Sequence, residues 1–91
     1  MSRKVRFERA ASRDVDRLPR EVQRRVVERI VALAEDPFGA GTKPLQGNLR
    51  GLRSVRVGDW RITYQADDPD MLRIIEISNR RDAYKRLGRE W

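Results

Sequence analysis

The side chains best suited to chemistry in this sequence are arginines on a short predicted β-hairpin. Between residues 51 and 64, apolar and polar residues alternate on either side of Gly58-Asp59, the pattern of two strands joined by a two-residue turn. That register places Arg56 directly opposite Arg61. Two facing guanidinium groups repel unless an anion or a nearby acid lies between them. We therefore predict a hairpin with one apolar face for the core and one basic face for a phosphate.

A second group of candidate residues lies near the C-terminus. Residues 71–79 are nearly continuously apolar and are followed by Arg80, which is typical of a strand covered on both faces. Pairing this strand with the hairpin, with Ile75 and Ile77 inward, places Arg80 and Glu76 on the basic face. Two roles are open to Glu76: it is a general base, or it only relieves the repulsion among the arginines.

Arginines that share one face suit the cleavage of an RNA phosphodiester. Without a metal ion this reaction uses the neighbouring 2′-hydroxyl as the nucleophile. An enzyme must take its proton, stabilise the charged phosphorane and protonate the leaving 5′-oxygen. The planar guanidinium binds two phosphate oxygens at once, so it suits the second task. The simpler alternative is a solvated basic surface on a sheet.

The composition excludes several other kinds of chemistry. The 91 residues include no histidine and no cysteine, which excludes imidazole acid–base catalysis, a Ser-His-Asp triad and thiolate metal sites. The carboxylates do not cluster at metal-ligand spacing, so we expect no metal and no cofactor. No apolar run approaches the roughly 20 residues of a membrane span, and the N-terminus lacks a signal-peptide core. We expect one cytoplasmic domain over residues 1–91.

The distribution of charge predicts a polyanionic partner. The net charge is +7 and the pI is about 11.0, which suggests either nucleic acid or an acidic protein. Residues 37–66 hold five basic side chains and one acidic side chain, so the excess gathers in one region. Within it, Lys43, Arg50 and Arg53 are candidate phosphate contacts, with plain surface charge as the alternative.

Three elements before the hairpin must support its apolar face. Residues 4–8 alternate and predict a strand with Val5 and Phe7 inward. Residues 11–18 predict a short helix, and residues 20–36 predict a longer one. The apolar stripe of the longer helix consists of Val22, Val26, Val27, Ile30, Leu33 and Ala34.

The remaining segments complete the expected order of elements. On the longer helix, Glu21 precedes Arg25 by four residues, which favours an ion pair. Residues 37–51 are rich in glycine and proline and predict a long loop, a length that is often functional. Residues 81–87 predict a C-terminal helix.

Three segments in this order resemble the RelE/ParE toxin superfamily of bacterial toxin–antitoxin pairs. Residues 43–52 are similar to the family pattern K-x-L-x-G-x-x-G-L, residues 55–64 to R-V-G-D-Y-R-I-x-Y, and residues 77–84 to I-G-H-R-x-D-V-Y. The resemblance covers nearly the whole chain and favours the RelE branch. It implies an α+β fold similar to small microbial ribonucleases, a small antiparallel-rich sheet packed by two N-terminal helices in the order β-α-α-β-β-β-α.

The resemblance also implies a function. For the RelE branch it implies a type II toxin that inhibits translation as a metal-independent endoribonuclease, cutting mRNA on the ribosome; for the ParE branch it implies inhibition of DNA gyrase. Matched by position, the catalytic residues are Arg56, Arg61, Arg80 and Tyr84. Tyr84 either stacks on a base, exchanges a proton, or packs the last helix onto the sheet. The candidate RNA-binding residues are Lys43, Arg50, Arg53 and Arg81.

Two departures from the family pattern leave a third function open. Ser54 stands where many members carry a basic residue, and Asn79 stands where histidine is common. A weakly active homologue that acts mainly through antitoxin binding is therefore also consistent with the sequence. In every case we expect an acidic, partly disordered antitoxin that covers the arginines and contacts the second helix. For the RelE branch the ribosome and mRNA are further partners.

Overall fold

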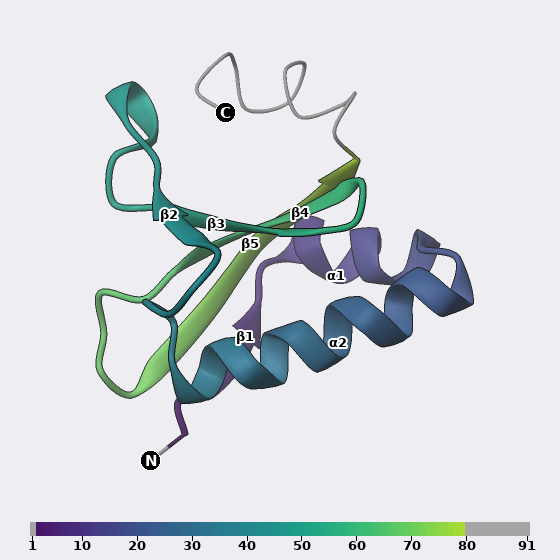
Figure 1. The fold of residues 1–91 in the computed structure, drawn as a ribbon, viewed down its shortest axis with the longest axis horizontal. Coiled ribbons are helices and arrows are strands. Elements are labelled where there is room, and N and C mark those ends of the chain that lie inside the picture. The colour runs from purple at the N-terminus through teal and green to yellow at the C-terminus, as the bar shows by residue number, and fades with distance from the viewer. Residues whose placement is uncertain (1, 80–91) are drawn as a thin grey trace.

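In the computed structural model, which describes residues 2–79, one five-stranded sheet carries both helices on the same face (Figure 1). The helices are α1 (Arg9–Arg17) and α2 (Arg20–Glu35). The strands are β1 (Lys4–Phe7), β2 (Thr42–Pro44), β3 (Arg53–Val57), β4 (Trp60–Gln65) and β5 (Met71–Asn79). They lie in the order β1-β5-β4-β3-β2, with β1 parallel to β5 and the other neighbours antiparallel. The predicted α+β class is confirmed.

The predicted order of elements needs one correction between the long helix and the hairpin. Residues 37–51 were expected to form a loop, but they contain β2 and a 3₁₀ turn, η1 (Gly47–Leu49). Lys43 pairs with Ser54, so β2 extends the sheet beyond the hairpin. The helix predicted over residues 81–87 lies outside the described residues.

The apolar stripe of α2 forms one side of the core. Val26, Ile30 and Leu33 are at most 3% exposed, and each such buried side chain contributes about 1.5–3 kcal/mol. Val27, which was predicted to share this stripe, is 44% exposed, as Val31 is at 60%. The stripe is therefore narrower than the sequence indicated. No helix in the described part of the chain is long and apolar enough to cross a membrane.

The hairpin has the register that its two-residue turn predicted. Arg56 lies opposite Arg61, and Val55 lies opposite Ile62. Gly58 has a φ of 62°, a conformation that glycine adopts without steric cost. Val55 and Ile62 are buried in the core beneath the helices, so their neighbours along each strand point to the opposite face of the sheet.

A register shift between β4 and β5 changes which isoleucines face the core. Thr63 pairs with Glu76, whereas the next residue of β4, Tyr64, pairs with Ile74. Ile75 is the extra residue of this bulge. The core positions are Ile74 and Ile77, so the predicted inward orientation is confirmed for Ile77 and wrong for Ile75. The shift leaves Glu76 on the face opposite the helices, as predicted.

Two side-chain hydrogen bonds tie the helices and the following segment to the sheet. The hydroxyl of Tyr64, which is fully buried, donates to the carbonyl of Pro37 just after α2. The carboxylate of Asp14 on α1 accepts the backbone N–H of Ile77 at 3.0 Å. β1 pairs with β5 only as far as Ile74, so Asp14 satisfies a donor of β5 beyond the end of β1.

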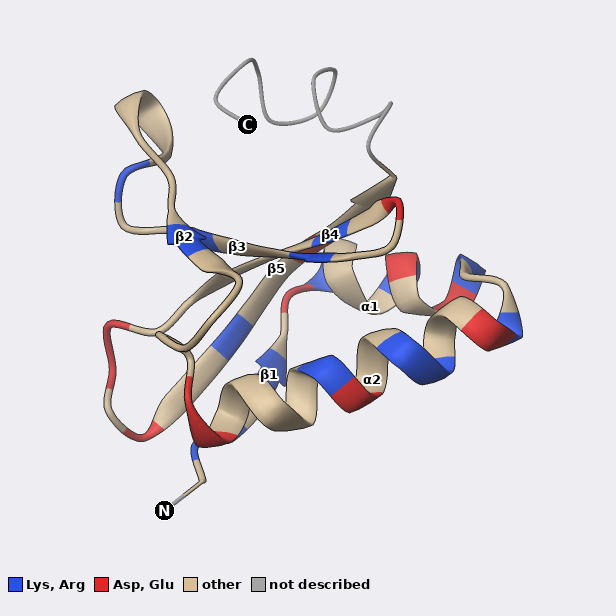
Figure 2. Ribbon diagram, viewed as in Figure 1, with Lys and Arg blue, Asp and Glu red and all other residues tan. Residues whose placement is uncertain are grey.

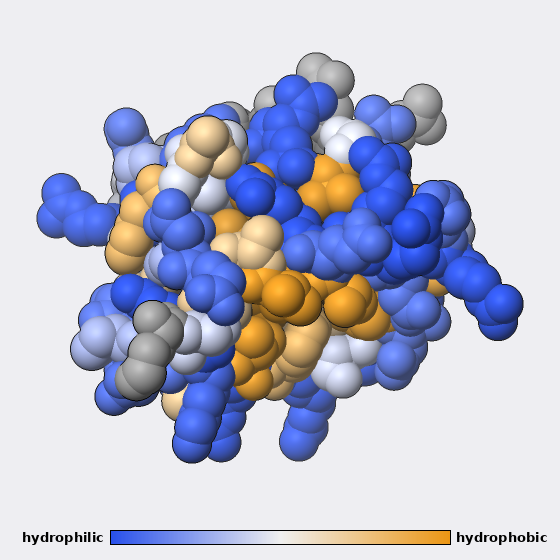
Figure 3. All heavy atoms as spheres, turned by 60° about the horizontal axis from the view of Figure 1, so that its bottom comes forward, coloured by the Kyte–Doolittle hydropathy of each residue, from blue (hydrophilic) through white to orange (hydrophobic). Residues whose placement is uncertain are grey.

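The side of the molecule formed by α2 and β1 exposes apolar side chains (Figure 3). Val5 and Phe7 were predicted to point inward, but they are 39% and 38% exposed. β1 is an edge strand, so one of its sides has no neighbouring strand in the sheet. The backbone N–H of Arg3 donates to the carbonyl of Ala34 at 2.9 Å, which holds this end of the chain against α2. We call the exposed side chains of Val5, Phe7, Val27 and Val31 the apolar patch.

Candidate functional site

The sheet face opposite the helices carries most of the residues that the sequence singled out. One row across the strands consists of Lys43 on β2, Ser54 on β3, Thr63 on β4 and Glu76 on β5. The neighbouring row consists of Arg56, Arg61 and Ser78. We call these seven residues the arginine face. They share it because strand residues two apart point to the same side of a sheet.

The charge on the arginine face is predominantly positive. Figure 2 shows basic positions along β2, β3 and β4. Arg56 is exposed and Arg61 is half-buried directly across from it. Glu76 brings one negative charge and is only 6% exposed. A phosphate is suited to such a face, because two guanidinium groups on adjacent strands can bind oxygens of the same anion.

The centre of the arginine face is lined by buried hydroxyl groups. Ser54, Thr63 and Ser78 are at most 2% exposed, so this part of the face is not the solvated basic surface that was the alternative prediction. Their hydroxyl oxygens have no hydrogen-bond partner among the described residues. A buried polar group left in that state costs about 1–3 kcal/mol. Such groups are rare in folded proteins and call for a functional or solvent partner.

Asn79 is the last residue of β5 and directly follows Ser78 of the arginine face. It pairs with Trp60 across β4 and β5, and both line a hollow of about 180 Å³ together with Ser78 and Asp14. The hollow lies between the end of the sheet and α1. Asn79 is two residues from the buried Ile77, so it lies on the helix side of the sheet, and its amide, which stands where the family pattern has an imidazole, is not part of the arginine face.

The other predicted RNA-binding residues lie in different places. Arg50 is exposed and follows η1. Arg53 does not join the arginine face: its guanidinium lies 5.0 Å from the centre of the Phe38 ring and donates to Thr42 Oγ1 at 2.9 Å. These contacts give Arg53 a structural role in holding the segment after α2. Three further predicted residues, Arg80, Arg81 and Tyr84, lie outside the described residues.

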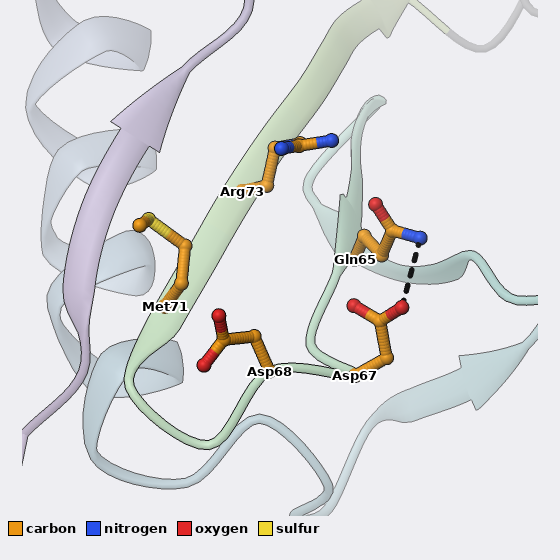
Figure 4. A pocket seen from close by; sticks show the side chains of 5 residues that line it. All are labelled: Gln65, Asp67, Asp68, Met71 and Arg73. Atoms are coloured by element: carbon orange, nitrogen blue, oxygen red, sulfur yellow. Dashed lines mark hydrogen bonds between the residues drawn. The ribbon is translucent and has the colours of Figure 1, made fainter.

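A larger hollow at the other end of the sheet is chemically unsuited to an anion. It has a volume of about 500 Å³ and is lined by Gln65, Asp67, Asp68, Met71 and Arg73 (Figure 4). Two carboxylates line it, and its one cation, Arg73, also lies 3.8 Å from Glu8. Gln65 donates to Asp67 at 3.3 Å. The arginine face is therefore the stronger candidate for a phosphate-binding site.

The sequence predicted the charged groups of the arginine face but not its buried hydroxyl groups. We call the hydroxyl groups of Ser54, Thr63 and Ser78 the hydroxyl floor. The paired arginines and Glu76 followed from strand alternation and the turn. The sequence pattern singled out Ser54 only because the family usually has a basic residue there, and it did not single out Thr63 or Ser78. Their burial depends on what packs around the centre of the sheet, which no local pattern encodes. The one available signal was that Thr63 and Ser78 lie two residues from Arg61 and Glu76, because strand residues two apart share a face of the sheet.

Comparisons with known proteins agree with the earlier resemblance. A family described as the ParE toxin of type II toxin–antitoxin system, parDE, matches residues 5–84. Toxin RelE of Mycobacterium tuberculosis is 39% identical over 77 residues, covering 82% of this chain and 78% of the relative. Toxin RelG of the same organism is 37% identical over 84 residues, covering 90% and 95%.

A solved structure shares both fold and sequence with this chain. It is the crystal structure of the toxin–antitoxin complex RelBE2 from Mycobacterium tuberculosis, with a TM-score of 0.77 and 32% sequence identity. The match covers 87% of this chain and 99% of that one. Both proteins therefore have the same fold over the matched residues.

Proposed function

The chain belongs to the ParE toxin family of type II toxin–antitoxin systems, within the RelE/ParE superfamily, and we propose that it is a toxin that cleaves messenger RNA on the ribosome without a metal ion. The observation that carries this proposal is the cross-strand pair of Arg56 and Arg61, which shares its face of the sheet with the hydroxyl floor. Its curated relatives, the toxins RelE and RelG, support the RelE branch.

The arginine face supplies the electrostatic part of the reaction. The phosphate of the scissile bond lies between Arg56 and Arg61, which are opposite each other on adjacent strands. Attack by the 2′-hydroxyl forms a bond from oxygen to phosphorus and breaks the bond to the 5′-oxygen, leaving a cyclic phosphate. The guanidinium groups stabilise the additional negative charge of the phosphorane, and such preorganised donors are usually the largest single contribution to catalysis.

Proton transfer requires groups beyond the two arginines. Glu76 is 6% exposed and pairs with Thr63 across β4 and β5. Because a carboxylate buried there is poorly placed to reach a substrate hydroxyl, its burial supports a role in balancing arginine charge over a role as general base. By resemblance, Arg80 and Tyr84 complete the site, with Tyr84 as the group able to exchange a proton. The basic residues Lys43 and Arg50, exposed on and after β2, bind the flanking RNA.

Replacing Thr63 with valine tests whether the hydroxyl floor serves the ligand. Valine has nearly the same shape but removes the buried hydroxyl, which has no partner among the described residues. We expect the free energy of unfolding to rise by about 1 kcal/mol, because burying that group is unfavourable. We expect the rate of mRNA cleavage to fall several-fold at the same time. Urea denaturation and a single-turnover cleavage assay measure the two effects.

A variant that gains stability and keeps the full cleavage rate would show that the hydroxyl has no part in the reaction. Ser12→Ala is the control for the removal of a hydroxyl, because Ser12 is exposed on α1. It should change neither quantity.

The partner that neutralises this toxin is an acidic antitoxin that covers the apolar patch as well as the arginine face. Val5, Phe7, Val27 and Val31 are between 38% and 60% exposed, and gathered apolar surface of this kind marks protein interaction sites. The related RelBE2 structure is a toxin–antitoxin complex. A net charge of +7 favours a negatively charged partner.

Replacing Val31 with aspartate is expected to weaken the antitoxin complex by at least about tenfold, because an aspartate that becomes buried in the interface is desolvated. Val31 is 60% exposed in the toxin alone, so the fold should remain intact. Isothermal titration calorimetry with the cognate antitoxin measures the change. Ser12→Asp, with the same change of charge at an exposed position on α1, is the matched control. Equal affinities for all three proteins would exclude the patch from the interface.

Inhibition of DNA gyrase is the second candidate function. The observation that favours it is the family match, because the matching family is described by the name ParE. Blocked DNA supercoiling with intact mRNA would identify this function, whereas cut mRNA with normal supercoiling would exclude it.

A further inference from the structure

A basic groove runs between α2 and the turn that joins β3 to β4. It has a volume of about 360 Å³ and opens widely to solvent, and its lining residues are Arg25, Glu28, Arg29, Ala32, Arg56, Val57 and Gly58. β2 pairs only with residues 53–55 of β3, so the last part of β3 is a free edge of the sheet. Arg56 lies on this edge and belongs both to the arginine face and to the groove.

The guanidinium of Arg25 is directed toward the hairpin instead of toward its own helix. The expected ion pair with Glu21 does not form, because Glu21 Oε1 accepts a hydrogen bond from Arg24 at 2.6 Å. Glu28 also lies 3.6 Å from Arg24. A β-carbon added at Gly58 would lie 3.6 Å from Nη1 of Arg25, which places that guanidinium against the turn.

Arg29, which lines the same groove, is held in place by a hydrogen bond to the backbone. Its Nη2 donates to the backbone carbonyl of Ala40 at 2.9 Å, so the side chain is held in place before any ligand arrives. Arg25, Arg29 and Arg56 form no ion pair with any residue of the described chain. The lining thus brings three positive charges and one negative charge, that of Glu28, to an open surface.

The two flanks of α2 differ in chemistry. Arg25, Arg29 and Ala32 line the groove, whereas Val27 and Val31 belong to the apolar patch. Residues two apart on a helix do not face each other, so these rows lie on different sides of α2. Three arginines line the groove, and this concentration of positive charge suits a phosphate backbone.

We propose that this groove binds a backbone phosphate of RNA next to the one held on the arginine face, with Arg56 between the two. The RNA strand then passes from the sheet over the free edge of β3 onto α2. The proposal rests on the function proposed above and extends its binding site to Arg25 and Arg29. The phosphate belongs either to the message or to ribosomal RNA, which share this chemistry.

Arg25→Gln tests the proposal, with Arg24→Gln as the matched control on the same helix. Arg24 and Arg25 are both exposed. Arg24 is held by its hydrogen bond to Glu21, and this bond together with the charges of Glu21 and Glu28 raises the pKa of its guanidinium. The binding constant is measured at several salt concentrations for a 2′-O-methyl single-stranded RNA, which cannot be cleaved, and for vacant ribosomes. Losing one phosphate contact should reduce the salt slope by about 0.7 on single-stranded RNA.

We expect Arg25→Gln to weaken binding several-fold and Arg24→Gln to leave it unchanged, with partial recovery in Arg25→Lys. An effect on both ligands assigns the phosphate to a single strand such as the message, and an effect on ribosomes alone assigns it to ribosomal RNA. Identical salt slopes for wild type and Arg25→Gln on both ligands overturn the proposal. So does a loss confined to antitoxin affinity, which would make the groove a protein interface.

The outcome for the groove is separable from the outcome for the proposed function. One outcome is that the salt dependence of RNA binding changes in Arg25→Gln although the wild type never cuts mRNA on ribosomes. The proposed cleavage function is then wrong, and the proposal for the groove is supported. If wild type cuts mRNA and Arg25→Gln matches it in binding and in KM, the groove fails and the cleavage function stands.

Discussion

Arg61→Ala is expected to lower the rate of mRNA cleavage on programmed ribosomes by at least about 10²-fold. Arg61 lies opposite Arg56, and removing one preorganised donor to a developing negative charge typically reduces the rate by about 10²–10³-fold. Because the loss concerns the transition state, kcat should fall more than KM rises. Single-turnover cleavage with mapped RNA ends gives the rate directly.

The stability of Arg61→Ala should stay close to that of wild type. Removing one of two opposed arginines relieves repulsion across the strands, which offsets part of the loss of its polar interaction and of the packing of its alkyl chain. Arg13→Ala replaces an exposed arginine on α1, which packs on the sheet face opposite the arginine face (Figure 1); it is the control for the loss of positive charge and should cleave at the normal rate. An Arg61→Ala protein with full activity would remove this residue from the site.

Ile62→Ala is expected to have the opposite profile, although Ile62 follows Arg61 directly. Ile62 is completely buried beneath the helices, and truncating such an isoleucine typically costs about 2–5 kcal/mol, including the cavity left behind. Urea denaturation should show this loss in the free energy of unfolding. The folded fraction should still cut mRNA, because the arginine face lies on the other side of β4.

The contrast between these two neighbours is the test of the two-faced strand. A small stability loss in Ile62→Ala, within about 0.5 kcal/mol as for surface substitutions, would mean that β4 does not place this residue in the core. A large stability loss in Arg61→Ala would mean that its side chain supports the fold instead of the reaction.

The hairpin could be predicted from sequence because its turn leaves little freedom. A two-residue loop fixes the register, so the opposition of Arg56 and Arg61 followed once Gly58 was placed in the turn. The core positions of α2 followed from helical spacing at Val26, Ile30 and Leu33. In both cases the determining residues are close together in the sequence.

The features that sequence reasoning missed depend on contacts between distant segments. Ile74 and Ile75 are equally apolar, so only the pairing of β5 with β4 decides which of them faces the core. β2 is three residues long and ends in Pro44, too short for a periodic pattern. Glu21 had two partners within reach, at three and four residues, and side-chain geometry favours Arg24.

The three surfaces of this molecule divide its interactions by chemistry. In the proposed function, the arginine face holds the phosphate that reacts, the basic groove extends the path of RNA over α2, and the apolar patch offers surface to the antitoxin. An acidic antitoxin long enough to reach from the patch to the arginines would exclude RNA by occupying the same charges. Under this proposal, one antitoxin would block RNA binding by covering surfaces of the same small protein.

The measurement that tests the central claim most directly is mapping of RNA ends on purified ribosomes programmed with mRNA, for wild type and Arg61→Ala. We predict discrete cleavage of ribosome-bound mRNA by wild type, none of naked mRNA, and a loss of at least about 10²-fold in Arg61→Ala. Intact mRNA with every protein, together with blocked supercoiling by gyrase in a parallel assay, would contradict the claim.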